Sequence, residues 1–497
     1  MADRTRARTL VDLVAGLAAA DPGRPALVVG ETTTTYGELE AAVGRAAANL
    51  AAAGVEPGSR LALVDDATLG SVAALLAAAR VGAACALMNP RLTVGELAAL
   101  VEVAEADAVG VAGPAYAEAL REAGVARVLG DEDVLADVAP VGPSAAPDPA
   151  AEAAVLFTSG TTGRPKPVPL AHGVLGPRVA AFAPSFRADV APSVALMCVP
   201  LVHIGGMLGL LVALSRGDTN VVQHRFDAGE WLALVARHRV NTVFVVPTML
   251  HRILEHPDFS RTDLHSLVAI SYGAAPAPPE LIRRAMAALP WVAFMNTFGQ
   301  TETLGSITTL MPEDHGTEKL TSVGRPMPGV EIRIVDPVSG ADVSTGTVGE
   351  LWVKTEASVL PAAPPSGPAP PPGWLRTGDM VSADDDGYLY PAGRLSDTIN
   401  RGGEKFAPLE IEVVLREHPA VADVAVGGVP DEEMGNRVGV AVVLRSPATA
   451  DELRSFCRGK LANFKLPERV VFVDDIPYND FGKVSRKELA ALLAEAG

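Results

Sequence analysis

Apolar residues along the chain alternate between longer helix-like stretches and short strand-like runs. Stretches rich in Ala and Leu cover residues 35–53, 70–81 and 94–104, and the apolar runs 60–64 and 108–112 separate them. Helical patterns between short apolar runs predict βα units with parallel strands. The predicted fold class is therefore α/β, with a large N-terminal domain built from βα layers.

The same alternation continues through the middle of the chain and then changes character. From 330 to 354, short runs punctuated by Gly, Pro and Asp predict a small antiparallel, barrel-like β element. A proline-dominated segment, 361–373, is typical of an extended surface loop. The middle of the chain holds strand candidates at 194–200, 220–223, 242–246 and 267–271 and helical patterns at 228–239 and 278–288.

Beyond residue 394 the composition becomes more charged and indicates a small α+β domain. Its predicted helices cover 408–417, 449–461 and 485–495, and its predicted strands cover 421–429, 438–444 and 469–473. A chain of 497 residues exceeds the size at which one core stops growing, so at least two domains are expected. We place the boundary between residues 1–395 and residues 396–497.

Charge and cysteine content exclude several classes of function. The formal net charge of −18 opposes nucleic acid or an anionic membrane as a standing partner, because both require a cationic surface. Cys85, Cys198 and Cys457 lie far apart without metal-ligand spacing, which fits a reducing cytoplasm. The apolar run 71–88 is broken by Arg80 and Gly82, so a buried helix and a strand are expected rather than a membrane span. The N-terminus indicates an amphipathic helix rather than a signal peptide.

Residues 158–166 combine hydroxyls, glycines and a lysine directly after an apolar run. Glycines let backbone N–H groups surround an anion, while hydroxyls and a lysine supply further donors, so the segment predicts a grip on a nucleotide triphosphate. The spacing Gly160-x-x-Gly163-x-x-Lys166 differs from the usual P-loop. Taken alone, such a loop is as easily a plain solvated connection.

Four further segments follow in a fixed order along the chain. They are Phe298-Gly299-Gln300-Thr301-Glu302-Thr303, Trp374-Leu375-Arg376-Thr377-Gly378-Asp379, Gly393-Arg394 with Ser396-Asp397, and Gly482-Lys483. Each has an ordinary alternative: Glu302 a surface acid, Asp379 a turn residue, Lys483 a solvated charge. Together with the loop at 158–166, this ordered set resembles the adenylate-forming superfamily of acyl-CoA synthetases, adenylation domains of peptide synthetases and firefly-type luciferases. The resemblance spans about Val11 to about Leu489.

The resemblance implies a binding site for ATP and Mg²⁺, with Glu302 as the metal ligand, since Mg²⁺ prefers oxygen donors. Asp379 is implied to accept hydrogen bonds from the ribose hydroxyls, and Arg394 to reach phosphate. The implied catalytic residues are Lys483, His203, Glu302 and Thr158. The implied nucleotide-binding residues are Thr158, Ser159, Gly160, Thr161, Thr162, Gly163, Lys166, Gly273, Ala274, Ala275, Pro276, Thr297, Phe298, Gly299, Gln300, Thr301, Asp379, Arg394 and Lys483.

The implied reaction activates a carboxylic acid as a mixed anhydride with AMP and then transfers the acyl group to a thiol. Lys483 would bridge the carboxylate and the α-phosphate as a point charge on a flexible stem. A rotation of a mobile C-terminal domain would then remove Lys483, with Ser396 at the hinge. Arg401, Gly402 and Gly403 would line the channel for coenzyme A, and the less favoured alternative is that the two glycines simply make a turn. Most relatives carry Asp or Lys at the hinge, and most have a less proline-rich 361–373 region.

The acyl pocket is implied to lie around the segments 203–211, 245–250 and 271–275. No acid follows His203 of the kind that holds a substrate ammonium, so a non-amino, apolar carboxylic acid is favoured. The pocket residues implied are His203, Gly205, Met207, Thr248, Gly273 and Asn296.

Three functional hypotheses remain from the sequence. The first is an AMP-forming acid–CoA ligase, and the second is an adenylating enzyme that loads a separate carrier-protein thiol. The third is a catalytically silent binding protein, which the intact Lys166, Glu302, Asp379, Arg394 and Lys483 oppose. Luciferase-type monooxygenation and a homodimeric state stay open.

Overall fold

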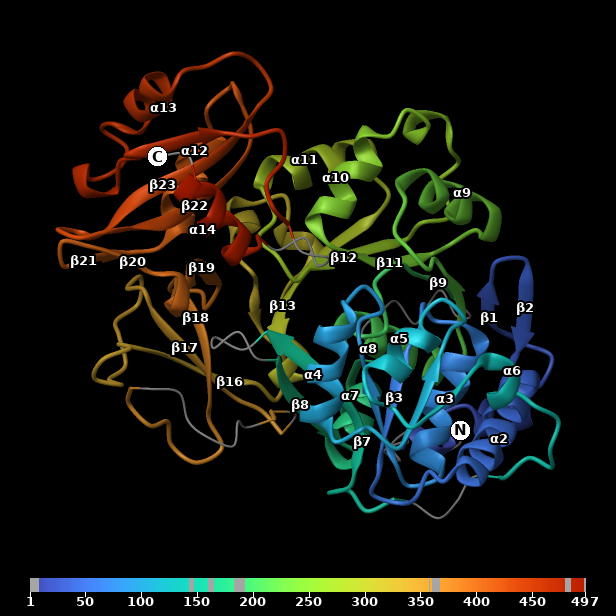
Figure 1. The fold of residues 1–497 in the computed structure, drawn as a ribbon. Coiled ribbons are helices and arrows are strands. Elements are labelled where there is room, and N and C mark those ends of the chain that lie inside the picture. Colours follow the sequence, from blue (N-terminus) through green and yellow to red (C-terminus); the bar gives the residue numbers. More distant parts are fainter. Residues whose placement is uncertain are drawn as a thin grey trace. The chain divides into compact units, whose positions relative to one another are not determined.

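The computed structural model describes residues 9–142, 147–159, 165–182, 193–356, 358–359, 367–478 and 484–495. Contacts between Cα atoms divide the chain into two compact units (Figure 1). Unit 1 comprises residues 1–273, 277–315 and 355–360, and unit 2 comprises residues 274–276, 316–354 and 361–497. This division assigns residues 316–354 to the same unit as the C-terminal tail. The boundary at 395/396 stays a prediction.

The first sheet of unit 1 has a parallel centre and antiparallel margins. Strands β10, β9, β11, β12 and β13 run parallel to one another, and β1 pairs parallel with β10. Strands β2 and β14 pair antiparallel with β1 and β13. Within unit 1 the order is β14 (Gly305–Leu310), β13 (Ala293–Gln300), β12 (Ala269–Gly273), β11 (Thr242–Val245), β9 (Val194–Met197), β10 (Thr219–Val222), β1 (Pro25–Val29) and β2 (Thr32–Thr35).

The second sheet of unit 1 is parallel except for its last strand. Its order is β6 (Arg127–Leu129), β5 (Val109–Ala112), β3 (Arg60–Val64), β4 (Ala84–Leu87), β7 (Glu152–Ser159) and β8 (Pro165–Ala171). The sequence did not predict β8, whose alternate prolines oppose a central strand. As an edge strand it accommodates Pro165, Pro167 and Pro169, because alternate N–H groups of an edge strand need no partner.

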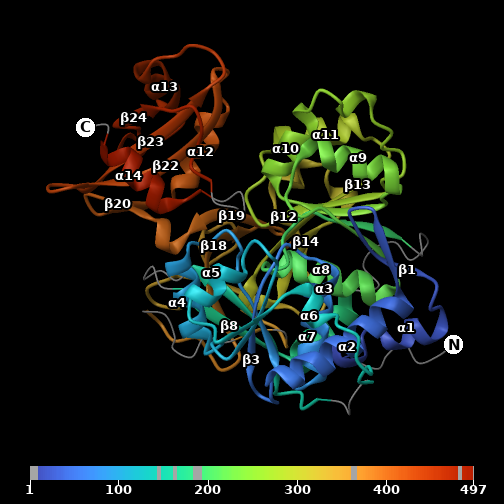
Figure 2. The same ribbon diagram turned by 45° about the vertical axis from the view of Figure 1, so that its right-hand side comes forward.

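The helices of unit 1 bury apolar faces against the two sheets. Helix α3 (Leu69–Arg80) is buried on every side, as its almost uninterrupted apolar sequence predicts. Capping boxes at Thr35 and Thr93 start α2 (Tyr36–Ala53) and α4 (Val94–Ala104). Helices α9 (Ala228–His238), α10 (Pro247–Glu255) and α11 (Pro279–Ala288) gather on one side of the first sheet (Figures 1 and 2). The others are α1 (Ala15–Ala20), α5 (Ala117–Glu122), α6 (Asp131–Val134), α7 (His172–Phe182) and α8 (Ile204–Arg216), with 3₁₀ turns at Leu10–Asp12, Phe259–Arg261, Thr301–Thr303 and Pro312–Asp314.

Each sheet of unit 1 has a point where the strand order reverses. In the first sheet, the chain passes from β9 to β10 on one side and then to β11 on the other. In the second sheet, β4 and β5 flank β3 in the same way. Ligands of open α/β sheets bind outside the carboxyl ends of strands at such reversals, so the segments after β9 and β11 are candidate binding segments.

Unit 2 is built from antiparallel hairpins and a small α+β layer. A meander sheet has the order β16 (Glu331–Val335), β17 (Gly349–Lys354), β18 (Leu375–Ala383) and β19 (Leu389–Arg394), as the antiparallel prediction for 330–354 requires. Strands β22 (Val421–Asp431), β23 (Gly435–Leu444) and β24 (Arg469–Phe472) form a second sheet, packed with α12 (Pro408–Arg416), α13 (Ala450–Cys457) and α14 (Arg486–Glu495). The remaining elements are β15 (Arg325–Pro326), β20 (Ile399–Arg401), β21 (Glu404–Phe406) and 3₁₀ turns at Glu318–Thr321, Leu395–Asp397 and Asn463–Lys465.

The α/β fold class and the smaller α+β region are confirmed, while individual boundaries shift. The helix predicted at 449–461 ends at Cys457, because Arg458 adopts an extended conformation and Gly459 a positive φ of 81°. Most other predicted elements of unit 1 begin and end within two residues of their predicted bounds. Among the described residues, no helix combines the length and apolar character needed to cross a membrane.

Candidate active site

The predicted phosphate-binding segment connects two antiparallel strands. Thr158 at the end of β7 is the register partner of Lys166 at the start of β8, and Ser159 pairs with Pro165. The predicted residues Gly160, Thr161, Thr162 and Gly163 lie outside the described residues, as does the side chain of Ser159.

The segment around Glu302 forms a second hairpin tip in unit 1. Gln300 at the end of β13 pairs with Gly305 at the start of β14, and a 3₁₀ turn over Thr301–Thr303 joins them. Gly299 is required there, because a Cβ atom would lie 2.0 Å from the carbonyl oxygen of Gly305. The segment that carries Glu302 is therefore a tight connection between two strands. Thr297 and Phe298 continue β13 below the turn.

Among the described residues, a contact joins the end of β7 to the turn after β13. Thr158 Oγ1 lies 3.5 Å from Glu302 Oε1, although the residues are 144 positions apart. No ion pair links Glu302 to a cationic side chain within the described ranges. The backbone carbonyl of Glu302 accepts a hydrogen bond of 2.7 Å from Val359 N. A half-buried carboxylate beside a hydroxyl, without a cation in contact, offers the hard oxygen donors that Mg²⁺ prefers.

The predicted acyl-pocket residues follow the parallel strands around the reversal point of the first sheet. His203 ends the loop after β9 and is the N-cap residue of α8, while Thr248 is the second residue of α10, which follows β11. Gly205 faces β11, since a Cβ there would lie 3.3 Å from Phe244 Cε1. Because β9, β11, β12 and β13 are parallel, their carboxyl ends share one edge of the sheet. The predicted residues Met207, Gly273 and Asn296 belong to the same group of elements, with Met207 fully buried.

The end of β12 is tightly packed against β13. A Cβ on Gly273 would lie 2.1 Å from the carbonyl oxygen of Thr297, so only glycine fits. The preceding residue, Tyr272, is buried and shares a 3.0 Å hydrogen bond with His315 Nε2. His315 Nδ1 lies 2.8 Å from the carbonyl oxygen of Met311, which requires Nδ1 to donate and Nε2 to accept. Burial lowers the pKa of His315, so this pair is neutral at pH 7.

Two predicted nucleotide residues of unit 2 are paired with each other. Asp379 on β18 and Arg394 on β19 are register partners, and Arg394 Nε lies 2.8 Å from Asp379 Oδ1. Asp379 N donates to Thr377 Oγ1 at 3.0 Å, and the Thr377 hydroxyl donates to the carbonyl of Leu351 at 2.7 Å. Arg376, just before this segment, forms a buried ion pair with Glu350 at 2.8 Å. These ion pairs and hydrogen bonds hold β18 against β17 and β19.

The predicted adenine-side and thiol-channel residues occupy turns of unit 2. Ala274 has a positive φ of 65°, and Ala275 and Pro276 follow it. Gly402 and Gly403 have φ values of 58° and 92°, so they make the two-residue turn between β20 and β21.

Arg401, before that turn, donates to Glu468 at 2.6 Å. The turn alternative for Gly402 and Gly403 is thus present, and their contact with coenzyme A stays a prediction. Ser396 lies in the 3₁₀ turn Leu395–Asp397, and its hydroxyl donates to Asp397 at 3.0 Å. Lys483 lies outside the described residues.

Sequence reasoning missed the residues that support the site from behind. Arg178 on α7 contacts the chain beyond Glu302, and His315 supports Tyr272 at the end of β12. Both are far in sequence from their partners, by 126 and 43 residues, and neither belongs to a recognisable motif. Only the folded chain brings them to the site.

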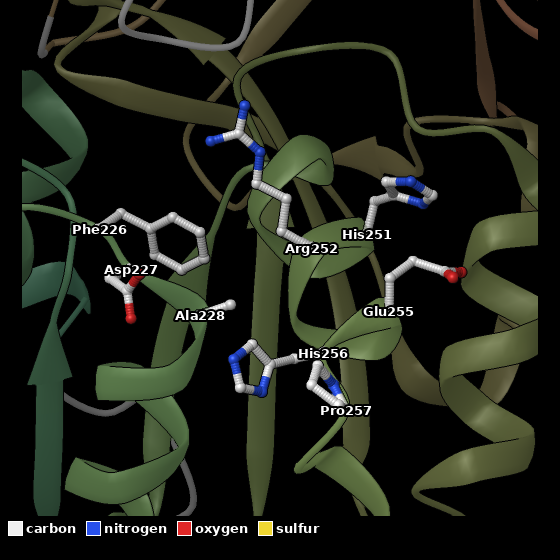
Figure 3. Close-up of a pocket in the computed structure, with 8 residues that line it drawn as sticks. All are labelled: Phe226, Asp227, Ala228, His251, Arg252, Glu255, His256 and Pro257. Atoms are coloured by element: carbon white, nitrogen blue, oxygen red, sulfur yellow. The ribbon is translucent and has the colours of Figure 1, made fainter.

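Two hollows on unit 1 lie away from the predicted site residues. One of about 340 Å³ is bounded by the segment entering α9 and by α10, where His251, Arg252 and Glu255 project and His256 lies between the helices (Figure 3). The other, of about 410 Å³, lies at the carboxyl ends of β3 and β5 and includes Asp65. Neither is lined by a predicted nucleotide or acyl residue, and the second carries more acidic than basic side chains. Its lining residues are Asp65, Asp66, Thr68, Gly113, Pro114, Ala115, Tyr116, His224, Arg225 and Glu230.

Known proteins resemble the chain over nearly its whole length. Residues 16–360 match the family described as AMP-binding enzyme, and residues 410–483 match the AMP-binding enzyme C-terminal domain. A feruloyl-CoA synthase of Amycolatopsis is 34% identical, covering 94% of this chain and 96% of the relative. A fatty acid–acyl-carrier-protein ligase of Streptomyces coeruleorubidus is 32% identical, covering 97% and 96%.

Solved structures agree with this assignment. The o-succinylbenzoate CoA synthetase of Bacillus subtilis, in complex with its acyl-adenylate intermediate, is 30% identical with a TM-score of 0.85, covering 96% of this chain and 97% of that chain. The same enzyme has also been solved with ATP and magnesium ion. The resemblance to adenylate-forming enzymes is thus confirmed, and the chain belongs to the AMP-binding enzyme family.

Proposed function

We propose that the protein is an AMP-forming acid–thiol ligase that makes acyl-CoA. In the first half-reaction a carboxylate oxygen attacks the α-phosphorus of ATP, and pyrophosphate leaves to give an acyl-adenylate. In the second, the sulfur of coenzyme A attacks the acyl carbon, the thiol proton is released, and AMP leaves. The observation that carries the proposal is the 3.5 Å contact between Thr158 and Glu302, which unites two distant motifs.

The residues around Glu302 fit a magnesium ion. Its carboxylate and the neighbouring hydroxyl of Thr158 are hard oxygen donors, and Mg²⁺ is commonly held by one or two carboxylates together with substrate phosphates. When bound, the ion supplies positive charge that neutralises the triphosphate during phosphoryl transfer. The role of Glu302 is to hold that charge at a fixed place.

The remaining nucleotide residues take the roles that family membership suggests. Lys166 and the hydroxyls of Thr161 and Thr162 contact the β- and γ-phosphates, and Asp379 accepts hydrogen bonds from the ribose. Arg394 neutralises Asp379 in the absence of nucleotide, and its remaining donors reach phosphate. Lys483 bridges the incoming carboxylate and the α-phosphate, where negative charge accumulates in the transition state. Phe298, Gly299, Gln300 and Thr301 shape the turn that presents Glu302.

The acid is non-amino and largely apolar. His203 caps helix α8, whose first residues Ile204-Gly-Gly-Met-Leu-Gly-Leu-Leu211 include no carboxylate to pair with a substrate ammonium. His203 lies at the carboxyl edge of the first sheet, together with Thr248, at the reversal point where α/β sheets bind ligands. We assign the acyl carboxylate to the neighbourhood of His203.

Coenzyme A is the acceptor, delivered past Arg401, Gly402 and Gly403 after the C-terminal segment has moved about Ser396. A carrier-protein thiol is the second candidate, because a similar protein of Streptomyces coeruleorubidus is a fatty acid–acyl-carrier-protein ligase.

A cytoplasmic location fits Cys85, Cys198 and Cys457, which are buried free thiols. Burial raises the pKa of the Cys198 thiol to about 12 and that of Cys457 to about 11, so neither is a reactive thiolate. We propose no nucleic-acid partner, and a homodimer is to be tested by light scattering.

The test is ATP–pyrophosphate exchange over a panel of carboxylic acids, followed by mass spectrometry with and without coenzyme A. Acid-dependent exchange together with an acyl-CoA product is expected. Exchange without a thioester would favour the carrier-protein acceptor, and absence of exchange with every acid would refute the ligase. Lys483→Ala should abolish exchange while retaining thioester formation from supplied acyl-adenylate.

A further inference from the structure

A buried arginine of α7 carries the inference. Arg178 is 7% exposed, and its guanidinium lies 4.4 Å from the centre of the Phe182 ring. Burial lowers its pKa to about 10, so the group remains charged at neutral pH. No ion pair joins Arg178 to a carboxylate in the described part of the chain. Burying a cation without a paired acid costs free energy of folding. A contribution to stability therefore does not explain why an arginine occupies this position.

The donors of Arg178 are directed at the turn beyond Glu302. Arg178 Nε donates to the carbonyl oxygen of Leu304 at 3.1 Å, and Nη2 donates to the carbonyl oxygen of Ser306. A planar guanidinium can hold two acceptors at once in a fixed relation, which a lysine ammonium on a flexible stem cannot do. Arg178 therefore clamps both sides of the exit from the turn.

That exit has a conformation which needs external support. Leu304 has a φ of 48° and Gly305 a φ of 89°, and positive φ values are unfavourable for leucine. The Leu304 side chain is completely buried in the core of unit 1, which holds one side of the residue. Thr303 Oγ1 lies 3.0 Å from the carbonyl of Gln300 and 2.7 Å from that of Gly305, which closes the turn from inside. Arg178 supplies the support from outside.

The direction of the Glu302 carboxylate depends on this turn. Glu302 is two residues before Leu304, and its Oε1 lies near Thr158 on the other hairpin. We infer that Arg178 is a positioning residue, which fixes the turn so that Glu302 meets the metal of the magnesium–ATP complex. The inference rests on the proposed role of Glu302. This role explains a charged side chain that lies outside the nucleotide-binding motifs of the sequence and forms no ion pair with the described residues.

The test separates positioning from stability by measuring nucleotide binding with and without the metal. Arg178→Lys keeps the charge and removes the two-carbonyl fork. We expect its affinity for ATP in excess Mg²⁺, measured by calorimetry without acid, to fall about tenfold, as is common when support of a metal ligand is lost. Its affinity for ATP in EDTA should equal that of the unaltered protein.

Arg80→Lys is the matched control. Arg80 is also a buried helical arginine, 4% exposed, and it donates to the carbonyls of Val11 and Val141 and to Glu40, away from Glu302. The variant Arg80→Lys should lower the melting temperature without changing the affinity for ATP in excess Mg²⁺ or in EDTA. If Arg178→Lys does not fold, Thr303→Val tests the same turn from inside, with the same selective loss expected.

Three outcomes decide the matter. Loss of affinity only in Mg²⁺ supports positioning. Equal loss in Mg²⁺ and in EDTA, or no loss, would overturn it in favour of a purely structural arginine. If the unaltered protein itself binds ATP equally with and without Mg²⁺, the role of Glu302 in the proposed function fails, and this inference fails with it.

Discussion

Two hairpins of this protein each carry a carboxylate of a predicted motif, and the two carboxylates have different electrostatic surroundings. In unit 1, the hairpin β13–β14 carries Glu302 at its tip beside the neutral hydroxyl of Thr158. In unit 2, the hairpin β18–β19 carries Asp379 within its strands, 2.8 Å from Arg394. A carboxylate that forms no ion pair with the described residues can take a metal, whereas an ion-paired carboxylate can still accept hydrogen bonds from hydroxyls.

The side chains that support the two hairpins also differ in charge. Strands β13 and β14 are supported by the neutral Tyr272–His315 pair and by Arg178, which donates to backbone carbonyls rather than to a carboxylate. Behind β18 and β19, Lys319 bridges Asp384 and Asp386 at 2.8 and 2.9 Å. The motif and turn carboxylates Asp379 and Asp384 of the second hairpin are thus ion-paired, whereas no ion pair joins Glu302 to a cation among the described residues.

The largest effect is expected from removing the charge at the first hairpin. Glu302→Gln should reduce ATP–pyrophosphate exchange by about 100-fold or more, because several kcal/mol of transition-state stabilisation by the metal are lost. Raising the Mg²⁺ concentration should restore part of the rate. Glu313→Gln, an exposed acid after β14, is the control and should leave the rate unchanged. Full activity of Glu302→Gln at limiting Mg²⁺ would contradict the metal role.

The corresponding change at the second hairpin should act on the ribose instead. Asp379→Asn should weaken ATP binding about 10- to 100-fold, since hydrogen bonds to a charged acceptor contribute about 1.5–3 kcal/mol. The decisive comparison uses ATP analogues that lack one ribose hydroxyl. They should bind the unaltered protein more weakly than ATP but bind the Asn variant no more weakly than ATP does. An additive loss would show that Asp379 does not contact those hydroxyls.

A matched pair of threonines distinguishes the hairpins at a smaller scale. Thr158→Val should slow exchange about 3- to 10-fold and raise the Mg²⁺ requirement, as expected for one hydrogen bond of about 0.5–1.5 kcal/mol. Thr377→Val removes a buried hydroxyl bonded to Leu351 and Asp379. It should lower thermal stability and leave the Mg²⁺ requirement unchanged. The same response from both variants would remove the distinction between the two sites.

The smallest effect concerns pH and stability. Burial lowers the pKa of His315, so the unfolded chain binds a proton at higher pH than the folded chain. The contribution of neutral His315 is complete above about pH 6.5 and is lost as the pH falls from there toward its folded pKa. Melting temperatures between pH 7.5 and 5 should therefore fall less steeply for His315→Gln than for the unaltered protein.

Asp384→Asn provides the control in the second hairpin. Burial opposes the ionised form of Asp384, but hydrogen bonds from Lys319, Tyr388 and Tyr390 outweigh it and lower the pKa to about 2. Its contribution is present above the unfolded value of about 3.8 and is lost only below it. The slope between pH 7.5 and 5 should not change in this variant. An unchanged slope in His315→Gln would mean that His315 is not the group responsible.

The α/β class, most helix and strand positions and the order of the motifs could be predicted from the chain itself. Hydrophobic periodicity determines which segments are helices, because each must bury one face, and short apolar runs between them determine the parallel strands. The strand β8 escaped prediction, since its alternate prolines are acceptable only at a sheet edge, which no local pattern reveals. The turn after Glu302 could not be predicted for a related reason. Leu304 has a positive φ, which is unfavourable for leucine unless its side chain is held in the core.

The sequence alone determined which carboxylates and glycines matter, because residue type limits what a side chain can donate, accept or permit. Only the tertiary structure decided their electrostatic state. Thr158 meets Glu302 across 144 residues, Arg178 reaches the Leu304 carbonyl across 126, and Arg394 neutralises Asp379 through strand register. The strength of a charge depends on its neighbours and on burial, and both are set by contacts between segments that are distant along the chain.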